Sequence, residues 1–305
     1  MSDKKKFVVV MSTYNGEKYL KSQIESILKQ EDIEVQLIVR DDGSKDKTIE
    51  ILEKYRDNKE LIWYSGDNLK PAKSFLNLLE YVENNINDLD YDYVAFADQD
   101  DIWDSQKLKA AAEQLSDKYD LYFCSMEPFY DSNPSMKSLI KAVILPKGEV
   151  LFRSSTAGCA MAFNKKVLHT INQYHPNYIE MHDSWILRVC TVLDYCIYAD
   201  SRALIQYRIH GNNACGSSIS FREKIINHTR YIFYNKDISS ETAHELLNGY
   251  ANRINSYYKD MLVLIDRKQE VERRKSKLLR RVIIMRFSTF SRKVTCIFKI
   301  LMGSI

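Results

Sequence analysis

The stretch FADQDD, residues 96–101, carries three aspartates, Asp98, Asp100 and Asp101, directly after a short apolar run. Carboxylates this close repel one another unless a cation lies among them. Mg²⁺ and Mn²⁺ prefer oxygen ligands and leave coordination positions for substrate phosphates. A solvated turn in which Asp104 caps the next helix would explain the same residues without any chemistry. The position of the aspartates after a buried strand favours the cation site.

A second acidic pair, Asp41 and Asp42, comes directly after the β-rich run VQLIVR and precedes Gly43 and Ser44. Asp, Gly and Ser are ordinary turn residues, so a plain turn is one interpretation. The other is that a carboxylate at the end of a central strand accepts a hydrogen bond from a nucleotide base or a ribose hydroxyl. The pair alone does not decide between them.

Strand-like and helix-like periodicities alternate along the first 125 residues. The expected strands are residues 7–12, 35–40, 61–64, 93–97 and 119–125. The expected helices between them are residues 17–29, 47–56, 72–84 and 104–115. This alternation predicts an α/β fold with a mainly parallel sheet covered by helices on both faces. Both acidic clusters then lie beyond the carboxyl ends of strands, where such sheets bind ligands, and form one shared site.

Further along the chain the pattern is less regular. Residues 127–148 show no clear period, residues 156–163 (TAGCAMAF) read as a buried strand, residues 183–193 as a helix and residues 203–208 as another strand. From about residue 217 onward the chain is expected to be helical and increasingly basic. We therefore divide it into a catalytic domain, residues 1–216, and a helical basic extension, residues 217–305.

Several segments together resemble a known family. Residues 12–17 (STYNGE), 41–48 (DDGSKDKT) and 98–103 (DQDDIW) resemble the family 2 glycosyltransferases of the GT-A fold. DQDDIW, residues 181–185 (MHDSW) and residues 207–213 (YRIHGNN) are similar to the bacterial rhamnosyltransferases that build cell-surface polysaccharides. The matching segments extend from residue 7 to about residue 213.

The resemblance implies roles for individual residues. It divides the catalytic domain into a nucleotide-sugar-binding half, residues 1–101, and an acceptor half, residues 102–216. Asp183 is implied as the catalytic base. The implied donor-binding residues are Thr13, Tyr14, Asn15, Glu17, Asp41, Lys73, Asp98, Gln99 and Arg208. The implied metal ligands, for Mn²⁺ or Mg²⁺, are Asp100 and His210, and the implied acceptor-side residues are Trp103, His182 and Trp185. His182 and Trp185 could instead be packing residues.

The chemistry of sugar transfer agrees with these roles. A bound cation offsets the charge that grows on the departing nucleoside diphosphate. A base must take the proton from the acceptor hydroxyl. Asp183 is expected in the first turn of a helix, whose N-terminus favours the ionised carboxylate. An ordinary helix cap would also explain Asp183, and an ordinary surface position would explain His210.

Composition and charge limit the remaining possibilities. The 305 residues are 45% hydrophobic and 28% charged, which is typical of a globular protein. The six cysteines form no CxxC pair, which predicts reduced thiols and a cytoplasmic location rather than a zinc or disulfide framework. The apolar run near the N-terminus is too short for a signal peptide, so we expect an unprocessed start.

The C-terminal extension is strongly basic. From Arg267 onward twelve Lys and Arg residues stand against Glu270 and Glu272, about +10, so the first 266 residues carry about −7. Residues 278–305 mix basic and apolar residues without a run long enough to span a bilayer. Such a segment can lie on the inner face of the plasma membrane, drawn to anionic lipid, or pack on the acidic domain with its basic face in solvent.

We therefore expect an inverting, metal-dependent glycosyltransferase. Its donor would be a dTDP- or UDP-linked rhamnose or hexose, and its acceptor a growing surface polysaccharide or lipid-linked glycan. No nucleic-acid partner is expected, and a homodimer is left open. The rivals are a non-catalytic nucleotide-sugar or glycan-binding protein and a nucleotidyltransferase of similar fold. A nucleotidyltransferase usually carries a glycine-rich loop with a basic residue after the first strand, and STYNGEKYL lacks it.

Overall fold

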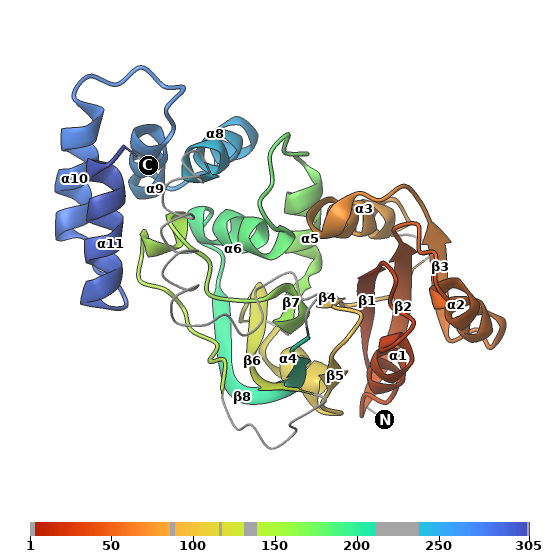
Figure 1. Ribbon diagram of the computed structural model, residues 1–305. Helices are drawn as coiled ribbons and strands as arrows, with labels where there is room; N and C mark the ends of the chain where they lie inside the picture. Colours follow the sequence, from red (N-terminus) through yellow and green to blue (C-terminus); the bar gives the residue numbers. More distant parts are fainter. Residues whose placement is uncertain (1–3, 86–88, 116–117, 131–138, 211–237, 304) are drawn as a thin grey trace.

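The computed structural model describes residues 4–85, 89–115, 118–130, 139–210, 238–303 and 305 (Figure 1). Its strands form one sheet in the order β3-β2-β1-β4-β7-β6-β8-β5. Their bounds are β1 Lys5–Thr13, β2 Ile33–Asp41, β3 Leu61–Ser65, β4 Tyr93–Ala97, β5 Ile102–Trp103, β6 Leu121–Phe129, β7 Met161–Asn164 and β8 Ile197–Arg208. The expected α/β architecture is confirmed, with a sheet that is mixed rather than parallel throughout.

The first four strands are parallel and create the point where the site forms. β1 pairs with β2 on one side and with β4 on the other, and β2 pairs with β3. The chain thus runs outward from β1 to β3 and then returns to the other side of β1. Such a reversal of strand order opens a crevice at the carboxyl ends of the two strands that flank it, here β1 and β4.

The remaining strands extend the sheet beyond β4. β7 is antiparallel to both β4 and β6, whereas β6 and β8 are parallel. The short strand β5 pairs antiparallel with β8 and thereby returns the chain after the aspartate cluster to the sheet edge. The loop at residues 98–101 is therefore fixed at both ends, by β4 and by β5.

Helices cover both faces of the sheet. The helices of the catalytic region are α1 Leu20–Leu28, α2 Thr48–Asp57, α3 Lys70–Asn84, α4 Lys107–Leu115, α5 Lys165–Asn172 and α6 His182–Val192. Helices α3, α5 and α6 contact one another over one face, and α1 and α4 lie on the other (Figure 1). β4 is accordingly buried along its whole length, and its sequence YVAFA is a continuous apolar run.

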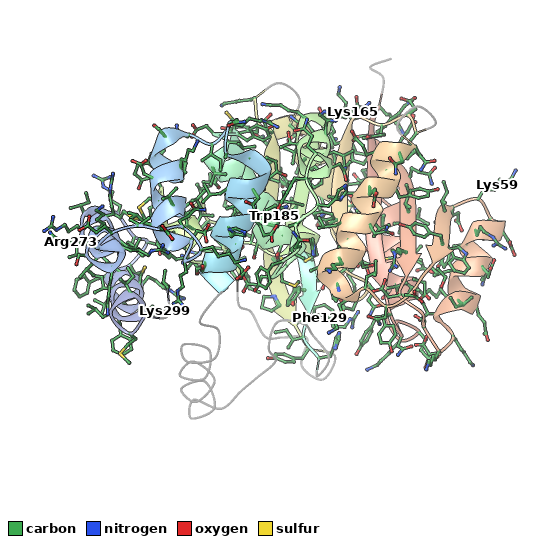
Figure 2. All side chains as sticks on the ribbon, turned by 90° about the horizontal axis from the view of Figure 1, so that it is seen from above. Lys59, Phe129, Lys165, Trp185, Arg273 and Lys299 are labelled. Atoms are coloured by element: carbon green, nitrogen blue, oxygen red, sulfur yellow. The ribbon has the colours of Figure 1, made fainter. Side chains whose placement is uncertain are left out.

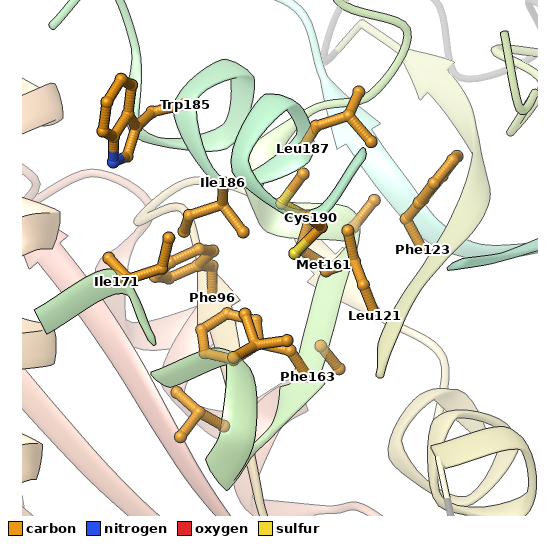
Figure 3. Packing of buried hydrophobic residues seen from close by; sticks show 14 of the residues in the cluster. Phe96, Leu121, Phe123, Met161, Phe163, Ile171, Trp185, Ile186, Leu187 and Cys190 are labelled. Atoms are coloured by element: carbon orange, nitrogen blue, oxygen red, sulfur yellow. The ribbon is translucent and has the colours of Figure 1, made fainter. Parts of the chain in front are cut away.

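The core under α6 joins residues from distant parts of the chain. Phe96 of β4, Phe163 of β7 and Ile186 of α6 lie together in it (Figure 3), and each is fully buried. The rings of Phe96 and Phe163 meet edge to face at 5.3 Å between centroids. This packing fixes α6, and with it Asp183, over the end of β4.

Helices α8 Ile238–Tyr250, α9 Ser256–Ile265, α10 Arg274–Ile284 and α11 Phe290–Leu301 form the C-terminal part of the molecule. They lie at the end of the molecule opposite to β3 and α2 (Figure 1). Within the described ranges, no helix has both the length and the apolar character to cross a bilayer. The expected boundary at residue 216 lies outside the described residues, as does the onset of the helical region at 217.

Two expectations for the middle of the chain need correction. Residues 156–163 are not one strand, because η2 (Gly158–Ala160) forms a short 3-10 turn and β7 is confined to Met161–Asn164. Helix α5, which is not among the expected elements, comes next and begins where the Asn164 side chain accepts a hydrogen bond from the amide of Val167. The five described cysteines are free thiols, and Cys215 lies outside the described residues.

Candidate active site

A cleft of about 770 Å³ opens where β1 and β4 end. Of the residues expected at the site, those that line the cleft are Tyr14, Asn15, Asp98, Gln99, Asp100, His182, Asp183 and His210. They come from the loops after β1 and β4, the start of α6 and the end of β8. The structure therefore brings together residues up to 196 positions apart in the sequence.

Gln99 joins the loop after β1 to the loop after β4. Its side-chain oxygen accepts hydrogen bonds from Thr13 Oγ1 at 2.6 Å and from the amide of Tyr14 at 3.0 Å. A Cβ on Gly16 would lie 2.5 Å from that oxygen, so only glycine permits this approach. Thr13 itself is buried beneath the cleft and acts through Gln99.

Asp41 and Asp42 have different environments. Asp41 is fully buried, and its Oδ2 accepts the amides of Gly43 and Ser44 at 2.9 Å each. It therefore shapes the turn after β2 and does not line the cleft. Asp42 does line it. The base-reading role expected for Asp41 thus fits the position of Asp42 better.

The Asp42 carboxylate is held in place from three sides. Oδ1 pairs with the Arg40 guanidinium and accepts the Ser74 hydroxyl at 2.8 Å, while Oδ2 accepts the amide of Leu69 at 3.1 Å. An ionised carboxylate offers about four acceptor positions. These contacts occupy three of them, which leaves one on Oδ2 for a donor in the cleft.

The aspartates after β4 have unequal exposure. Burial, together with the charges of Asp100 and Asp183, raises the pKa of Asp98 to about 7. Asp101 is fully buried, accepts the amide of Arg208 at 3.0 Å, and has its pKa raised by burial and by its two acidic neighbours. Mutual repulsion among these groups is the condition that a bound cation relieves.

Two groups of atoms could hold such a cation. Asp98, Asp101 and Cys159 each place one ligand atom within 4.8 Å of the others. Cys159 is fully buried and burial raises the pKa of its thiol, which disfavours the thiolate that a metal requires. Asp100 Oδ2 instead lies 2.7 Å from His210 Nε2, and both residues line the cleft. The fit is better at Asp100 and His210.

Arg208 supports the aspartate loop from behind. Its Nε donates to the backbone oxygen of Asp100 at 2.8 Å, and its guanidinium lies 4.4 Å from the centre of the Tyr19 ring. Arg208 is not among the residues that line the cleft. It thus orients the loop, whereas the family resemblance implied that it contacts the donor.

Asp183 and His182 stand in the first turn of α6 and line the cleft. Asp183 accepts the amide of Ser184, yet burial raises the pKa of its carboxyl. The effect of burial thus outweighs that of the helix N-terminus, which was expected to favour the ionised form. His182 is 2% exposed, and neither ring nitrogen has a hydrogen-bond partner. Burial lowers its pKa to about 3, so the imidazole is neutral.

Besides Thr13, Asp41 and Arg208, four more of the expected residues do not line the cleft. Trp103 is buried beneath the Lys107 ammonium, which lies 3.2 Å from its ring centre. Trp185 belongs to the buried core (Figure 3), where its ring contacts those of Tyr174 and Tyr250. Neither tryptophan is placed to contact an acceptor there. Glu17 and Lys73, both expected on the donor side, also lie outside the cleft lining. Glu17 accepts the amide of Lys47 at 3.0 Å, and Lys73 is exposed on the first turn of α3.

Other residues that were not expected at the site also line the cleft. The cationic ones are Lys18 and Lys70. Lys70 belongs to the segment NLKP, where Pro71 stands in the first turn of α3, and this Lys-Pro pair at a helix start was the available signal in the sequence. Tyr207 and Gly158 also line the cleft. A Cβ on Gly158 would lie 2.3 Å from His182 Nε2, and no feature of the sequence pointed to that contact.

Comparison with known proteins agrees with this geometry. The model of Glycosyl transferase family 2 matches residues 8–186. A dTDP-rhamnosyl transferase, RfbG of Shigella flexneri, is 29% identical over 247 residues, which are 75% of this chain and 82% of RfbG. Poly(ribitol-phosphate) beta-N-acetylglucosaminyltransferase TarS of Staphylococcus aureus is 33% identical over 121 residues, which are 37% of this chain and 19% of TarS.

Solved structures share the fold. The crystal structure of S. aureus TarS 1-349 in complex with UDP matches with a TM-score of 0.57 at 21% identity, covering 86% of this chain and 70% of that one. Its likeness places the sheet and the flanking helices described above in the GT-A class. The family match extends across β1, β4 and the start of α6, and so includes most of the residues that line the cleft. The chain belongs to glycosyl transferase family 2 and is a glycosyltransferase with the GT-A fold.

Proposed function

We propose that the protein transfers a sugar, rhamnose or a hexose, from a dTDP- or UDP-linked donor to a cell-surface polysaccharide or lipid-linked glycan, with inversion at the anomeric carbon. The observation that carries this proposal is the meeting of Asp98, Asp100 and Asp183 in one cleft at the switch between β1 and β4. Two relatives support the donor class: RfbG is named a dTDP-rhamnosyl transferase, and TarS structures hold UDP and UDP-GlcNAc.

Asp42 is suited to select a pyrimidine base. The one acceptor position left on its Oδ2 matches the single N3–H of uracil or thymine. The positive charge of Arg40 offsets the negative charge of the buried Asp42 carboxylate, so Asp42 remains a hydrogen-bond acceptor in the cleft. Lys18 and Lys70 on the cleft wall would attract the diphosphate.

Asp100 and His210 would hold Mn²⁺ or Mg²⁺, with Asp98 beside them. One solved relative of the fold, a mannosyltransferase from Pyrobaculum calidifontis with a TM-score of 0.50, contains GDP-Man and Mn²⁺. When bound, the metal supplies positive charge against the departing diphosphate. The protein's own part is to keep the carboxylates in place. Gln99 joins the loop after β4 to Thr13, and Arg208 donates a hydrogen bond to the backbone of Asp100.

Asp183 is the proposed base. A carboxyl with a raised pKa is a stronger base when ionised than an exposed carboxylate, and Asp183 lines the same cleft as Asp98 and Asp100. Attack by an acceptor hydroxyl that Asp183 deprotonates, on the side of the sugar opposite to the departing diphosphate, would produce inversion. His182 is neutral and can exchange a hydrogen bond with a sugar hydroxyl without competing for the proton.

The C-terminal helices would hold the enzyme on the inner face of the plasma membrane. Phe290, Val294, Phe298 and Leu301 recur at helical spacing on α11 and are 46–82% exposed. The opposite side of the same helix buries Cys296 and Ile300 against the molecule. Both interpretations of the tail thus have support: α11 packs on the rest of the chain and still presents an apolar stripe, which we call the α11 stripe.

The test is nucleotide-dependent thermal stabilisation. UDP, dTDP and GDP are each added with and without Mn²⁺, to the wild type and to Asp100→Ala. A ligand at 100 times its Kd stabilises by about 2.7 kcal/mol. We expect a Mn²⁺-dependent rise in Tm with UDP or dTDP that Asp100→Ala loses. Absence of a shift with every nucleotide would overturn the proposed donor site.

A further inference from the structure

Three cavities lead away from the catalytic cleft along the sheet. The first, of about 340 Å³, shares Ala157 and Tyr207 with the cleft. The second, of about 220 Å³, shares Phe123 and Ser155 with the first. The cleft and these two cavities therefore adjoin one another in succession.

The third cavity reaches the C-terminal helices. Its volume is about 660 Å³, and it shares Ile144, Leu145 and Lys147 with the second cavity. On its other side it is lined by Arg281 and Ile284 of α10. We call the three cavities together the apolar trough; it connects the cleft with the helix pair that carries the α11 stripe.

One wall of the trough exposes apolar side chains on a fixed backbone. In this wall Ile140 is 41% exposed and Ile144 is 54% exposed. The backbone of this wall is nevertheless held, because Ile140 exchanges two hydrogen bonds with Met126 of β6. An ordered segment that keeps large apolar side chains in water indicates an apolar ligand.

The charged groups that line the trough are mostly cationic. Among the described residues they are Lys141, Lys147, Arg281 and Arg286, against the carboxylate of Asp194. The Asp194 carboxylate accepts a hydrogen bond from the Asn255 side-chain amide at 2.6 Å. An apolar channel with cationic groups along it complements a hydrocarbon chain attached to a phosphate.

We propose that the apolar trough binds the hydrocarbon chain of an acceptor lipid phosphate or diphosphate. The trough would guide the chain from the α10–α11 surface to the cleft, where the attached sugar meets Asp183. This inference rests on the proposed function, because it assigns a binding location to the lipid-linked acceptor proposed there. A bilayer itself is too broad to enter the trough and is assigned to the α11 stripe instead.

The experiment measures binding of farnesyl phosphate, below its critical micelle concentration, by isothermal titration calorimetry with the full-length chain. Ile144→Asp places a charge in the wall that two of the cavities share. Ile62→Asp makes the same change at an exposed isoleucine of β3, outside the trough. We expect Ile144→Asp to weaken binding at least tenfold and Ile62→Asp to leave it unchanged.

Farnesol and inorganic phosphate serve as the two half-ligands. Both should bind at least tenfold more weakly than farnesyl phosphate, and Lys141→Gln, in the cavity that adjoins the cleft, should reduce only the binding of the phosphorylated compound. Equal binding by Ile144→Asp and the wild type, equal binding of farnesol and farnesyl phosphate, or no binding to the wild type would each overturn the proposal. The nucleotide shift of the same preparation tests the donor site separately, so the two failures are distinguishable.

Discussion

At the residue scale, burial shifts the pKa values of the two neighbours at the start of α6 in opposite directions. Burial disfavours the charged form of each: the pKa of the Asp183 carboxyl rises, and that of His182 falls to about 3. A lowered pKa makes His182 a weak base, whereas a raised pKa makes the Asp183 carboxylate a stronger one, so Asp183 is the group suited to take a proton from an acceptor hydroxyl. His182, stacked on Phe75 at 4.0 Å between ring centres, contributes shape and a hydrogen-bonding edge.

Asp183→Asn should abolish transfer while the donor still binds. The amide keeps the shape of the side chain but cannot accept the proton, and a positioned base contributes about 10²–10⁴-fold to the rate. Turnover with the donor that the nucleotide shift selects, and the shift itself, are the two readouts. Asp57→Asn, at an exposed residue of α2, is the control. Transfer that survives in Asp183→Asn at the wild-type rate would remove Asp183 from the base role.

His182→Phe should make the stability less sensitive to acid. The folded pKa of His182 lies below its usual value of 6.5, so the unfolded chain takes up a proton that the folded protein refuses as the pH falls below 6.5. At pH 5.5 this lowers the free energy of unfolding by about 1.4 kcal/mol. Urea denaturation at pH 7.5 and 5.5 should show a drop smaller by that amount in the variant. An equal drop in both proteins contradicts a neutral His182.

At the element scale, the success of sequence reasoning depends on burial. β4 coincides with its predicted range because both of its faces are covered and its sequence is uniformly apolar. The same reasoning places its aspartates at the cleft, since the end of a strand fixes the position of the next residues. Asp41 and Asp42 show where this reasoning fails. Of these two adjacent carboxylates, one shapes the loop and the other lines the cleft, and the contacts of Arg40 and Ser74, which the sequence does not reveal, decide that it is Asp42 that lines the cleft.

The tryptophans show a second limit. The family resemblance implied that Trp103 and Trp185 lie beside the acceptor, but a helix turns a side chain about 100° at each step and a strand reverses it. Trp185 therefore points into the core while Asp183 faces the cleft. The apolar trough could not be predicted either, because it joins β6, residues 139–147 and α10, which share no local pattern.

Glu149 anchors the α10–α11 pair to the catalytic region. Its carboxylate is buried, pairs with Arg153 Nε at 2.6 Å, and accepts the amide and hydroxyl of Ser288 at 2.6 and 2.8 Å. Burial alone would raise the pKa of Glu149, but hydrogen bonds from Arg153 and Ser288 hold this pKa below its usual value. The stability this contributes is present above pH 4.5 and is lost as the pH falls through the lowered pKa.

Glu149→Ala should loosen the α10–α11 pair selectively. The change leaves Ser288 and Arg153 without their acceptor, at a cost of about 1–3 kcal/mol. Hydrogen exchange should therefore quicken in residues 274–301 and stay unchanged in β1 and β4. Glu53→Ala, at a partly exposed residue of α2, controls for the loss of a glutamate. Exchange that quickens evenly over the whole chain would indicate general destabilisation and no specific anchor.

At the scale of the whole molecule, the basic C-terminal helices lie at one end of the long direction. Arg273 and Lys299 mark this basic end, and Lys59 lies at the other end (Figure 2). The basic end also holds the α11 stripe and the far end of the apolar trough. An anionic surface would therefore meet the basic end first, and the catalytic cleft would lie at the other end of the trough, within reach of a chain that leaves the bilayer.

Phe290→Ser should weaken binding to anionic vesicles by about tenfold or more. Phe290 is 82% exposed at the start of the α11 stripe, and inserting such a side chain into an apolar environment is worth about 1.5–3 kcal/mol. Co-sedimentation with vesicles of phosphatidylglycerol and phosphatidylcholine measures the effect. Ser291→Ala, on the same helix and outside the stripe, should bind as the wild type does.

The salt dependence separates the two contributions to membrane binding. Raising the salt from about 0.1 to about 0.5 M should weaken the vesicle binding of all three proteins, because salt screens the charges of the basic residues and does not affect the insertion of apolar side chains. Equal binding by Phe290→Ser and the wild type would mean that α11 does not enter the bilayer and that charge alone holds the protein there.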